Sequence, residues 1–181
     1  MGREIRMVPP NWHHPRDDRG NLRPMYDRNF DDVFAEWLVD FDRIRRGELT
    51  NVERNCYAEP GMNPLAEWLR DEGMPPTSDQ HRPWRTEDAT WVQVWETVSE
   101  GTPVTPPFAT KAELVDYLVA GGDDWDRKRG RGGYTRAQAE AFVGAGWVPS
   151  MVVTRGPSGA QMFNGIESAE VFSGPDPDRK P

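Results

Sequence analysis

Residues 90–98 read Thr-Trp-Val-Gln-Val-Trp-Glu-Thr-Val and form the clearest strand pattern in the chain. The alternation of apolar and polar positions is incomplete but sufficient to predict a strand. One face carries Val92, Val94, Glu96 and Val98, and the other carries Trp91, Gln93, Trp95 and Thr97. Since both faces hold large apolar side chains, the segment is predicted to be a central strand that is covered on both sides.

A proline-rich segment follows over residues 99–110, Ser-Glu-Gly-Thr-Pro-Val-Thr-Pro-Pro-Phe-Ala-Thr. Prolines restrict the backbone, and rigid polar loops between ordered elements commonly carry function. With the strand's tryptophans beside it, the segment suggests a polar and aromatic pocket. The candidate residues are Ser99, Glu100, Thr102, Thr105, Trp91 and Trp95. The alternative is a structural connector whose hydroxyl groups bind neighbouring backbone, and the sequence favours neither interpretation.

Four segments have the apolar spacing and end signals of helices. These segments are residues 29–46, 63–73, 110–121 and 135–144. The last two begin with capping boxes at Thr110 and Thr135. Residues 48–62 and 123–133 are predicted to be loops, and residues 150–164 are predicted to form a hairpin around Gly-Pro-Ser-Gly.

The predicted fold class is α+β, because helices and strands do not alternate regularly. We expect a small antiparallel sheet, built from the strand near 90–98 and the hairpin near 150–164 and covered by about four helices. The expected organisation is an extended N-terminal arm over residues 1–28, a single α+β domain over residues 29–172 and a flexible tail over residues 173–181.

The composition excludes several classes of protein. A net charge of −8 argues against general nucleic-acid binding, which relies on Lys and Arg. Cys56 is the only cysteine, so no intrachain disulfide forms, as is typical of a reducing cytosol. No apolar run approaches the ~20 residues that cross a bilayer, so no membrane partner is expected. His13 and His14 are adjacent and lack nearby cysteines, so neither a metal nor a cofactor is predicted.

Residues 127–134, Arg-Lys-Arg-Gly-Arg-Gly-Gly-Tyr, form the one concentrated basic run. Arginine makes bidentate contacts to phosphate and glycine lets backbone N–H groups approach an anion, so Arg127, Arg129 and Arg131 are candidate phosphate ligands. The spacing matches neither the phosphate loop nor the dinucleotide fingerprint. Nearby aspartates partly cancel the charge, and the sequence favours a solvated loop over a phosphate site.

Tryptophans are the third group of candidates. Trp37 and Trp68 lie on apolar helix faces and are predicted to be buried. Trp12, Trp84 and Trp125 lie in predicted loops beside prolines or charged residues, which makes them candidates for an interaction surface. The alternative is that these three indoles hold their loops against the core.

Two segments carry a resemblance to a known family. Residues 2–15 read Gly-Arg-Glu-Ile-Arg-x-Val-Pro-x-Asn-Trp-x-His-Pro, and residues 99–106 read Ser-Glu-Gly-Thr-Pro-x-x-Pro. Together they resemble a family of small proteins encoded by bacteriophages and prophages, and the similarity covers most of the chain. The resemblance implies a viral accessory protein in a host bacterial cytoplasm, and it implies no catalytic residues.

The sequence therefore leads to one main functional hypothesis, a non-enzymatic phage accessory protein that counters a bacterial defence by binding. It would either occlude a host protein effector or sequester a small phosphate-bearing signal between residues 99–107 and 127–133. An enzyme acting on nucleotides or nucleic acid is the alternative, and it requires Glu96, Glu100 or His81 to converge with one of the arginines at 129 and 131. A virion or assembly component is a third hypothesis, and oligomer formation is left open.

Overall fold

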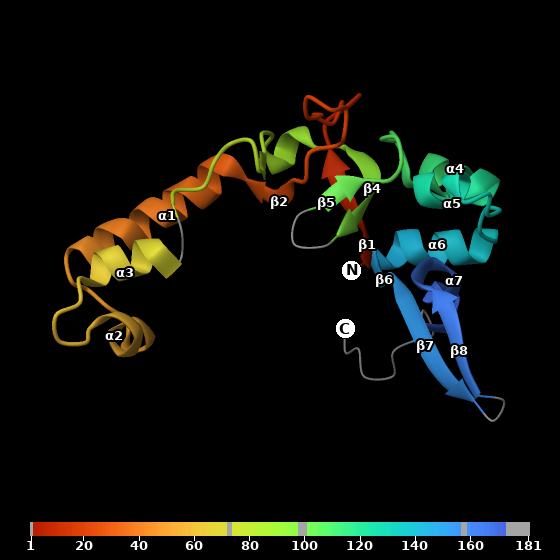
Figure 1. Cartoon of the computed structure of the whole chain (residues 1–181). Coiled ribbons are helices and arrows are strands. Elements are labelled where there is room, and N and C mark those ends of the chain that lie inside the picture. Colours follow the sequence, from red (N-terminus) through yellow and green to blue (C-terminus); the bar gives the residue numbers. More distant parts are fainter. Residues whose placement is uncertain (1, 72–73, 98–100, 157–158, 173–181) are drawn as a thin grey trace, which may run out of the picture. The chain divides into compact units, whose positions relative to one another are not determined.

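The computed structural model describes residues 2–71, 74–97, 101–156 and 159–172 (Figure 1). The chain forms two compact units, each with a core of its own. We call residues 1–26 and 84–181 the sheet unit, and residues 27–83 the helical unit. Among the described residues, no helix combines the length and the apolar character that crossing a membrane requires.

The sheet unit is built on a four-stranded antiparallel sheet with the strand order β5-β4-β1-β6. Its strands are β1 (Gly2–Val8), β4 (Trp91–Thr97), β5 (Gly101–Pro103) and β6 (Trp147–Pro149). β4 lies between β1 and β5, and it pairs with β1 along the whole length of both strands. The predicted central strand is therefore confirmed over its described residues.

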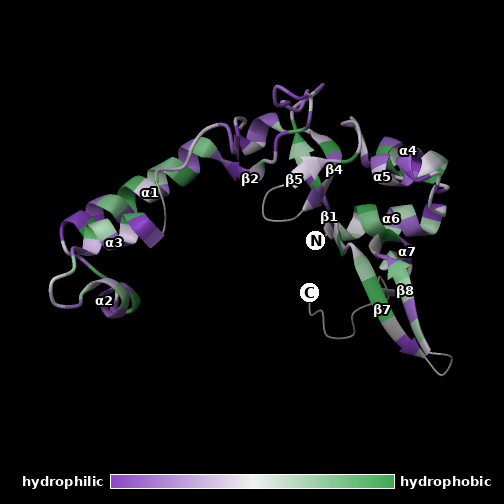
Figure 2. Ribbon diagram, viewed as in Figure 1, coloured by the Kyte–Doolittle hydropathy of each residue, from purple (hydrophilic) through white to green (hydrophobic). Residues whose placement is uncertain are grey.

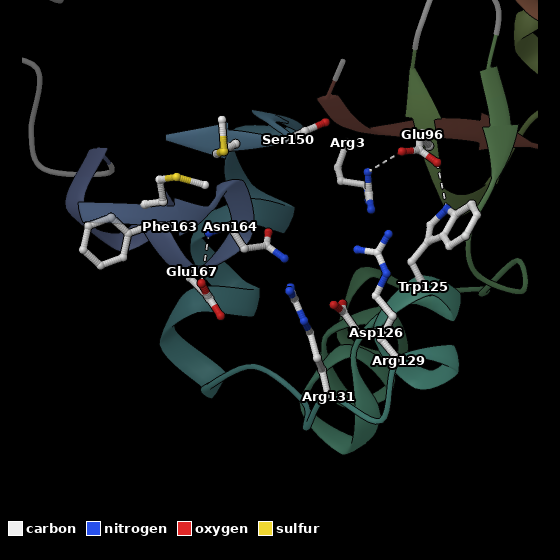
Figure 3. A pocket seen from close by; sticks show the side chains of 12 residues that line it. Arg3, Glu96, Trp125, Asp126, Arg129, Arg131, Ser150, Phe163, Asn164 and Glu167 are labelled. Carbon is white, nitrogen blue, oxygen red and sulfur yellow. Dashed lines mark hydrogen bonds and ion pairs between the residues drawn. The ribbon is translucent and has the colours of Figure 1, made fainter. Parts of the chain in front are cut away.

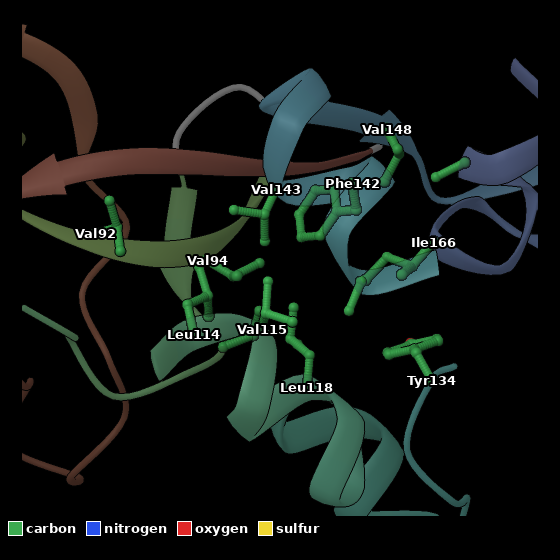
Figure 4. Close-up of a cluster of buried hydrophobic side chains, with 13 residues drawn as sticks. Val92, Val94, Leu114, Val115, Leu118, Tyr134, Phe142, Val143, Val148 and Ile166 are labelled. Atoms are coloured by element: carbon green, nitrogen blue, oxygen red, sulfur yellow. The ribbon is translucent and has the colours of Figure 1, made fainter. Parts of the chain in front are cut away.

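Helices cover one face of this sheet. They are α4 (Lys111–Gly121), α6 (Arg136–Ala145) and α7 (Gly165–Phe172). Val92 and Val94 of β4 pack against buried helix residues such as Leu118, Phe142 and Ile166 (Figure 4). This apolar contact holds the sheet unit together and confirms the α+β class.

The opposite face of the sheet is covered by a second core, which we call the tryptophan cluster. It contains Val8, Trp12, Met25, Trp84, Ala89, Trp91 and Trp95. The rings of Trp12 and Trp84 lie 4.4 Å apart between centroids, and His14 meets Trp95 edge-on at 4.9 Å. A 3-10 helix over Thr86–Asp88 leads from Trp84 to Ala89. Side chains from irregular segments thus bury the face that the helices leave free.

The described residues of the helical unit form three helices and a two-stranded sheet that begins at the adjoining Tyr26. They are β2 (Tyr26–Asn29), α1 (Phe30–Arg45), α2 (Asn51–Tyr57), α3 (Pro64–Asp71) and β3 (His81–Arg82), with β2 pairing with β3. Its core is formed by Ile44, Tyr57 and Trp68. Trp37 of α1 lies 5.7 Å from Trp68 of α3 between ring centroids. Trp68 is buried as predicted, whereas Trp37 is only half-buried.

Side-chain caps start the helices where the sequence predicted. The Asn29 side chain accepts a hydrogen bond from the Asp31 N–H at 2.9 Å, and Asn63 accepts one from Leu65 at 3.1 Å. The capping boxes that begin with Thr110 and Thr135 are both formed. Because each cap satisfies N–H groups that a helix leaves unpaired, these starts are fixed locally.

The prediction that the hairpin strands belong to the same sheet as residues 90–98 was wrong, although the predicted α+β fold class was right. The hairpin strands β7 (Met151–Gly156) and β8 (Gly159–Asn164) pair with each other and with no other described strand. Pro149 ends β6, and it has no N–H with which to continue a ladder. The places beside β4 are taken by β1 and β5 instead. Several apolar residues lie along the hairpin (Figure 2).

Two predicted loops contain helices. α2 lies within residues 48–62, and α5 (Asp124–Lys128) lies within residues 123–133. Each begins with a capping box that the sequence interpretation overlooked, Thr50 with Glu53 and Asp123 with Asp126. Both helices are short, so they have little apolar periodicity to reveal them. β6 and α7 were not predicted either.

Candidate functional site

A cavity of about 600 Å³ lies in the sheet unit between β1, the turn after α5 and the hairpin (Figure 3). Ligand pockets commonly measure about 300–1,000 Å³. Its lining combines arginines, carboxylates, an indole and apolar side chains. The lining residues are Arg3, Glu96, Trp125, Asp126, Arg129, Arg131, Ser150, Met151, Met162, Phe163, Asn164 and Glu167.

Arg3 joins the sheet to α5 at the inner end of this cavity. The register places Arg3 directly opposite Glu96, and its Nη1 donates to Glu96 Oε1 at 3.1 Å. Its Nε donates to Asp123 Oδ2 at 2.7 Å, and the Asp123 side chain is 1% exposed. Asp123 Oδ1 accepts the N–H groups of Trp125 and Asp126 at 2.8 and 3.0 Å. The charge of Arg3 is therefore neutralised within the protein.

Asp126 continues the same network toward the hairpin. Its Oδ2 accepts hydrogen bonds from the Tyr134 hydroxyl and, at 3.2 Å, from the Asp123 N–H. Burial raises the pKa of Asp126, and burial beside that carboxyl also raises the pKa of Tyr134. Asn164 Nδ2 donates to the Tyr134 hydroxyl at 3.1 Å. This chain of contacts fixes residues 123–134 between β1 and β8.

Arg129 and Arg131 extend from the turn into the cavity (Figure 3). Their backbone N–H groups are held by carbonyl oxygens, Arg131 by Asp126 at 2.9 Å and Arg129 by Trp125 at 3.1 Å. In the part of the chain that the structure describes, neither guanidinium group forms an ion pair or a side-chain hydrogen bond. Two cations carried on a hydrogen-bonded backbone thus face the cavity with their donors available.

Glycine explains the path of this basic turn. A Cβ on Gly133 would lie 1.9 Å from the Val119 carbonyl oxygen of α4, so a larger residue does not fit there. The next residue, Tyr134, donates its N–H to the Leu118 carbonyl oxygen at 3.1 Å. Gly133, one of the glycines that suggested anion binding, therefore serves the close approach of the turn to α4.

Trp125 forms one side of the cavity. Its Nε1–H donates to Glu96 Oε2 at 2.7 Å, which fixes the indole, and the residue remains 40% exposed. Arg129 Cζ lies 5.6 Å from the ring centroid. A fixed and exposed indole beside an arginine is a suitable surface for stacking a flat ring.

The hairpin forms the side of the cavity opposite Trp125. Met151 lies directly opposite Asn164, and Met162 precedes Asn164 by two residues, so the three side chains share one face of the hairpin. The two methionines are 52% and 69% exposed. Ser150 Oγ, which also lines the cavity, has no hydrogen-bond partner among the described residues. This side thus combines apolar side chains with the Asn164 amide, the Glu167 carboxyl group and the Ser150 hydroxyl.

Some sequence-predicted residues do meet here. Trp125, Arg129 and Arg131 line one cavity together with Glu96, one of the three residues of which the enzyme hypothesis required at least one. Arg127 does not line it, because its guanidinium stacks on Tyr117 at 4.1 Å and donates to backbone carbonyl oxygens of α4 and the residue after it.

The proline-rich segment has a different role where it is described. Thr105 is buried, and its Oγ1 accepts the Val94 N–H at 3.1 Å and donates to the Pro106 carbonyl oxygen at 2.9 Å. These bonds match the connector interpretation. Thr102 lies on β5 opposite Glu96 and does not line the cavity. Ser99 and Glu100 lie outside the described residues.

The other tryptophan candidates lie in the tryptophan cluster. Trp95 and Trp84 are buried at 0% and 6% exposure, and Trp12 and Trp91 are half-buried against them. Here the indoles hold the loops against the sheet, which was the alternative interpretation.

Several cavity residues were missed by the sequence interpretation. Arg3, Asp126, Asn164 and the two hairpin methionines come from segments that were predicted to be an arm, a loop and a sheet hairpin. The alternation of residues 3–8 signals a strand, and its pairing with β4 would have placed Arg3 beside Glu96. Nothing in the sequence signals the approach of the hairpin to α5.

No family model, no curated protein and no solved structure matches the chain. Within the described ranges, no group of three or more His, Cys, Asp and Glu side chains is arranged to hold a metal ion.

Proposed function

We propose that the chain is a non-enzymatic accessory protein of bacteriophage type that counters a bacterial defence by sequestering a small phosphate-bearing signal. The observation that carries this proposal is the pair of guanidinium groups, Arg129 and Arg131, that face the cavity without an ion pair to any described residue. Guanidinium groups bind phosphate through paired hydrogen bonds. The resemblance of residues 2–15 and 99–106 to phage-encoded proteins supports the setting, a host bacterial cytoplasm.

The indole of Trp125 supports a nucleotide rather than a simple anion. Its ring is exposed beside Arg129, and base stacking on such a ring contributes about 1–3 kcal/mol. The net charge of −8 does not oppose this, because the cations of the cavity are local and the pocket needs to hold only one small ligand. Occlusion of a host effector and a virion role stay predictions from the sequence.

An enzyme acting on nucleotides is a second candidate, because Glu96 lines the same cavity as Arg129 and Arg131. General acid or base catalysis would require a carboxyl group that is free to reach the ligand. Both oxygens of Glu96 are already bonded, one to Arg3 and the other to Trp125. The geometry therefore supports binding better than turnover.

Thermal unfolding with a panel of nucleotides tests the proposal. A ligand at 100 times its dissociation constant stabilises the protein by about 2.7 kcal/mol, so the correct class gives a clear rise in Tm. The double variant Arg129→Ala/Arg131→Ala is expected to lose this rise. Arg45→Ala/Arg46→Ala is the matched control, because it removes the same charge from the exposed end of α1 and should keep the rise.

Two results would contradict the proposal: no nucleotide raises Tm, or the cavity variant responds as the wild type does. Chromatography of the nucleotide after incubation separates the two candidate functions. Recovery of intact nucleotide is expected for sequestration, whereas conversion to product would show that the enzyme hypothesis is correct.

A further inference from the structure

The cavity presents its groups in a fixed order that indicates the class of nucleotide. Figure 3 shows Asn164 and Trp125 on opposite sides of the arginine side chains. Met151 and Met162 share the hairpin face of Asn164 and line the same cavity. The order across the cavity is therefore an apolar methionine wall, a centre of arginines that also holds the Asp126 and Glu167 carboxyl groups, and an indole.

Each end of this order suits a flat ring. The indole of Trp125 is 40% exposed with its N–H fixed on Glu96, so its face is the part that a base can stack on. Lys128 Nζ and Arg129 Cζ lie 5.2 and 5.6 Å from the ring centroid, so a stacked base would lie beside two cations. Methionine thioethers make favourable contacts with aromatic rings, and the two methionines are exposed by half or more. Apolar surface at both ends of a cationic centre indicates a ligand with rings at both ends and negative charge between them.

The centre supplies the charge for phosphate groups. Arg129 and Arg131 have no ion pair with a described residue, whereas Arg3 is held by Glu96 and Asp123. A mononucleotide has one base, so it would leave either the methionine wall or the indole without a partner. A ligand with two bases occupies both.

We propose that the cavity binds a dinucleotide, with its phosphate groups at Arg129 and Arg131, one base on Trp125 and the other on the methionine wall. This inference rests on the proposed function and narrows it to one class of signal. It predicts that the two ends contribute separately to affinity, because they contact different bases.

Isothermal titration calorimetry with four probes tests the inference: cyclic diadenylate, linear diadenylate, AMP and pyrophosphate. At least one dinucleotide should bind about tenfold or more tighter than AMP, the effect of one additional stacked base. The variant Met151→Ala/Met162→Ala should lose about tenfold in dinucleotide affinity and leave AMP binding unchanged. Val52→Ala is the control, since Val52 is 73% exposed on α2 of the helical unit and does not line the cavity.

The outcomes separate this inference from the proposed function. If AMP binds as tightly as both dinucleotides, or if the methionine variant weakens AMP and dinucleotide equally, the dinucleotide assignment is overturned while nucleotide sequestration stands. If pyrophosphate binds as tightly as the dinucleotides, the dinucleotide assignment is overturned as well. If none of the four probes binds and no nucleotide of the thermal panel raises Tm, the proposed function itself fails.

Discussion

The tryptophan cluster and the cavity use the same pair of residue types in opposite ways. In the cluster, Arg6 lies 4.5 Å from the ring centroid of Trp95, which is 0% exposed, and it donates to the Met25 carbonyl oxygen at 2.6 Å. In the cavity, Arg129 lies 5.6 Å from Trp125, which is 40% exposed, and has no ion pair with a described residue. An arginine on a tryptophan is therefore structural when its donors are used and a candidate ligand site when they are free.

The largest expected effect separates these two arginines by stability. Arg6→Ala should lower the free energy of unfolding by about 3 kcal/mol, because it leaves the Glu4 carboxylate without its buried ion-pair partner. It also removes one of the two donors to the Met25 carbonyl oxygen, which keeps the Gly101 N–H at 3.0 Å. Arg129→Ala should change it by no more than about 0.5 kcal/mol, as exposed substitutions do. Urea denaturation followed by tryptophan fluorescence measures both values. If Arg6→Ala and Arg129→Ala lowered the free energy of unfolding equally, the distinction between a structural arginine and a ligand-binding arginine would be wrong.

The next effect concerns Thr105, the buried hydroxyl beside the cluster. Thr105→Val removes the acceptor of the Val94 N–H and should cost about 1–3 kcal/mol of stability while leaving nucleotide affinity unchanged. Thr102→Val is the control, since Thr102 is half-buried on β5 and should change stability by less than about 0.5 kcal/mol. If Thr105→Val is as stable as the wild type but binds nucleotide more weakly, the proline-rich segment is a binding loop rather than a connector.

The smallest effect is a pH dependence that belongs to the cluster. Burial lowers the pKa of His14, which lies edge-on to Trp95. The unfolded chain therefore binds a proton more readily than the folded protein, and the free energy of unfolding should fall as pH falls below about 6.5. Burial also lowers the pKa of His81 in the helical unit, with the same sign. In His14→Gln, the free energy of unfolding should therefore depend less steeply on pH than in the wild type, because only the contribution of His81 remains of the two. An unchanged slope would show that His14 does not contribute.

The parts of the fold that were predictable depend on neighbours in sequence. Asn29 and Thr110 indicate where helices begin, and the pattern of residues 91–97 predicts a strand. These signals are readable because they act within one helical turn or one strand. The sheet order was not predictable, because the pairing of β1 with β4 joins residues about ninety positions apart. Short helices such as α5 have too few residues for a periodic pattern.

The residues proposed from sequence for the candidate site also fall into those that the structure places in the cavity and those that it does not. Residue chemistry alone selected Trp125, Arg129 and Arg131, and the structure brings all three into one cavity. The same reasoning selected Trp95 and Thr105, which are buried, because sequence does not show whether a polar or aromatic group is already satisfied by the fold. That distinction requires the tertiary partners.

The central claim is that nucleotide binds beside Trp125 and leaves the tryptophan cluster undisturbed. The indole N–H signals in a ¹H–¹⁵N NMR spectrum test it directly, with the Trp125 signal assigned from a Trp125→Phe variant. During titration with nucleotide, the Trp125 signal should shift progressively and that of Trp95 should stay in place. Shifts confined to the cluster signals, or no indole shift at a nucleotide concentration that saturates binding, would contradict the account.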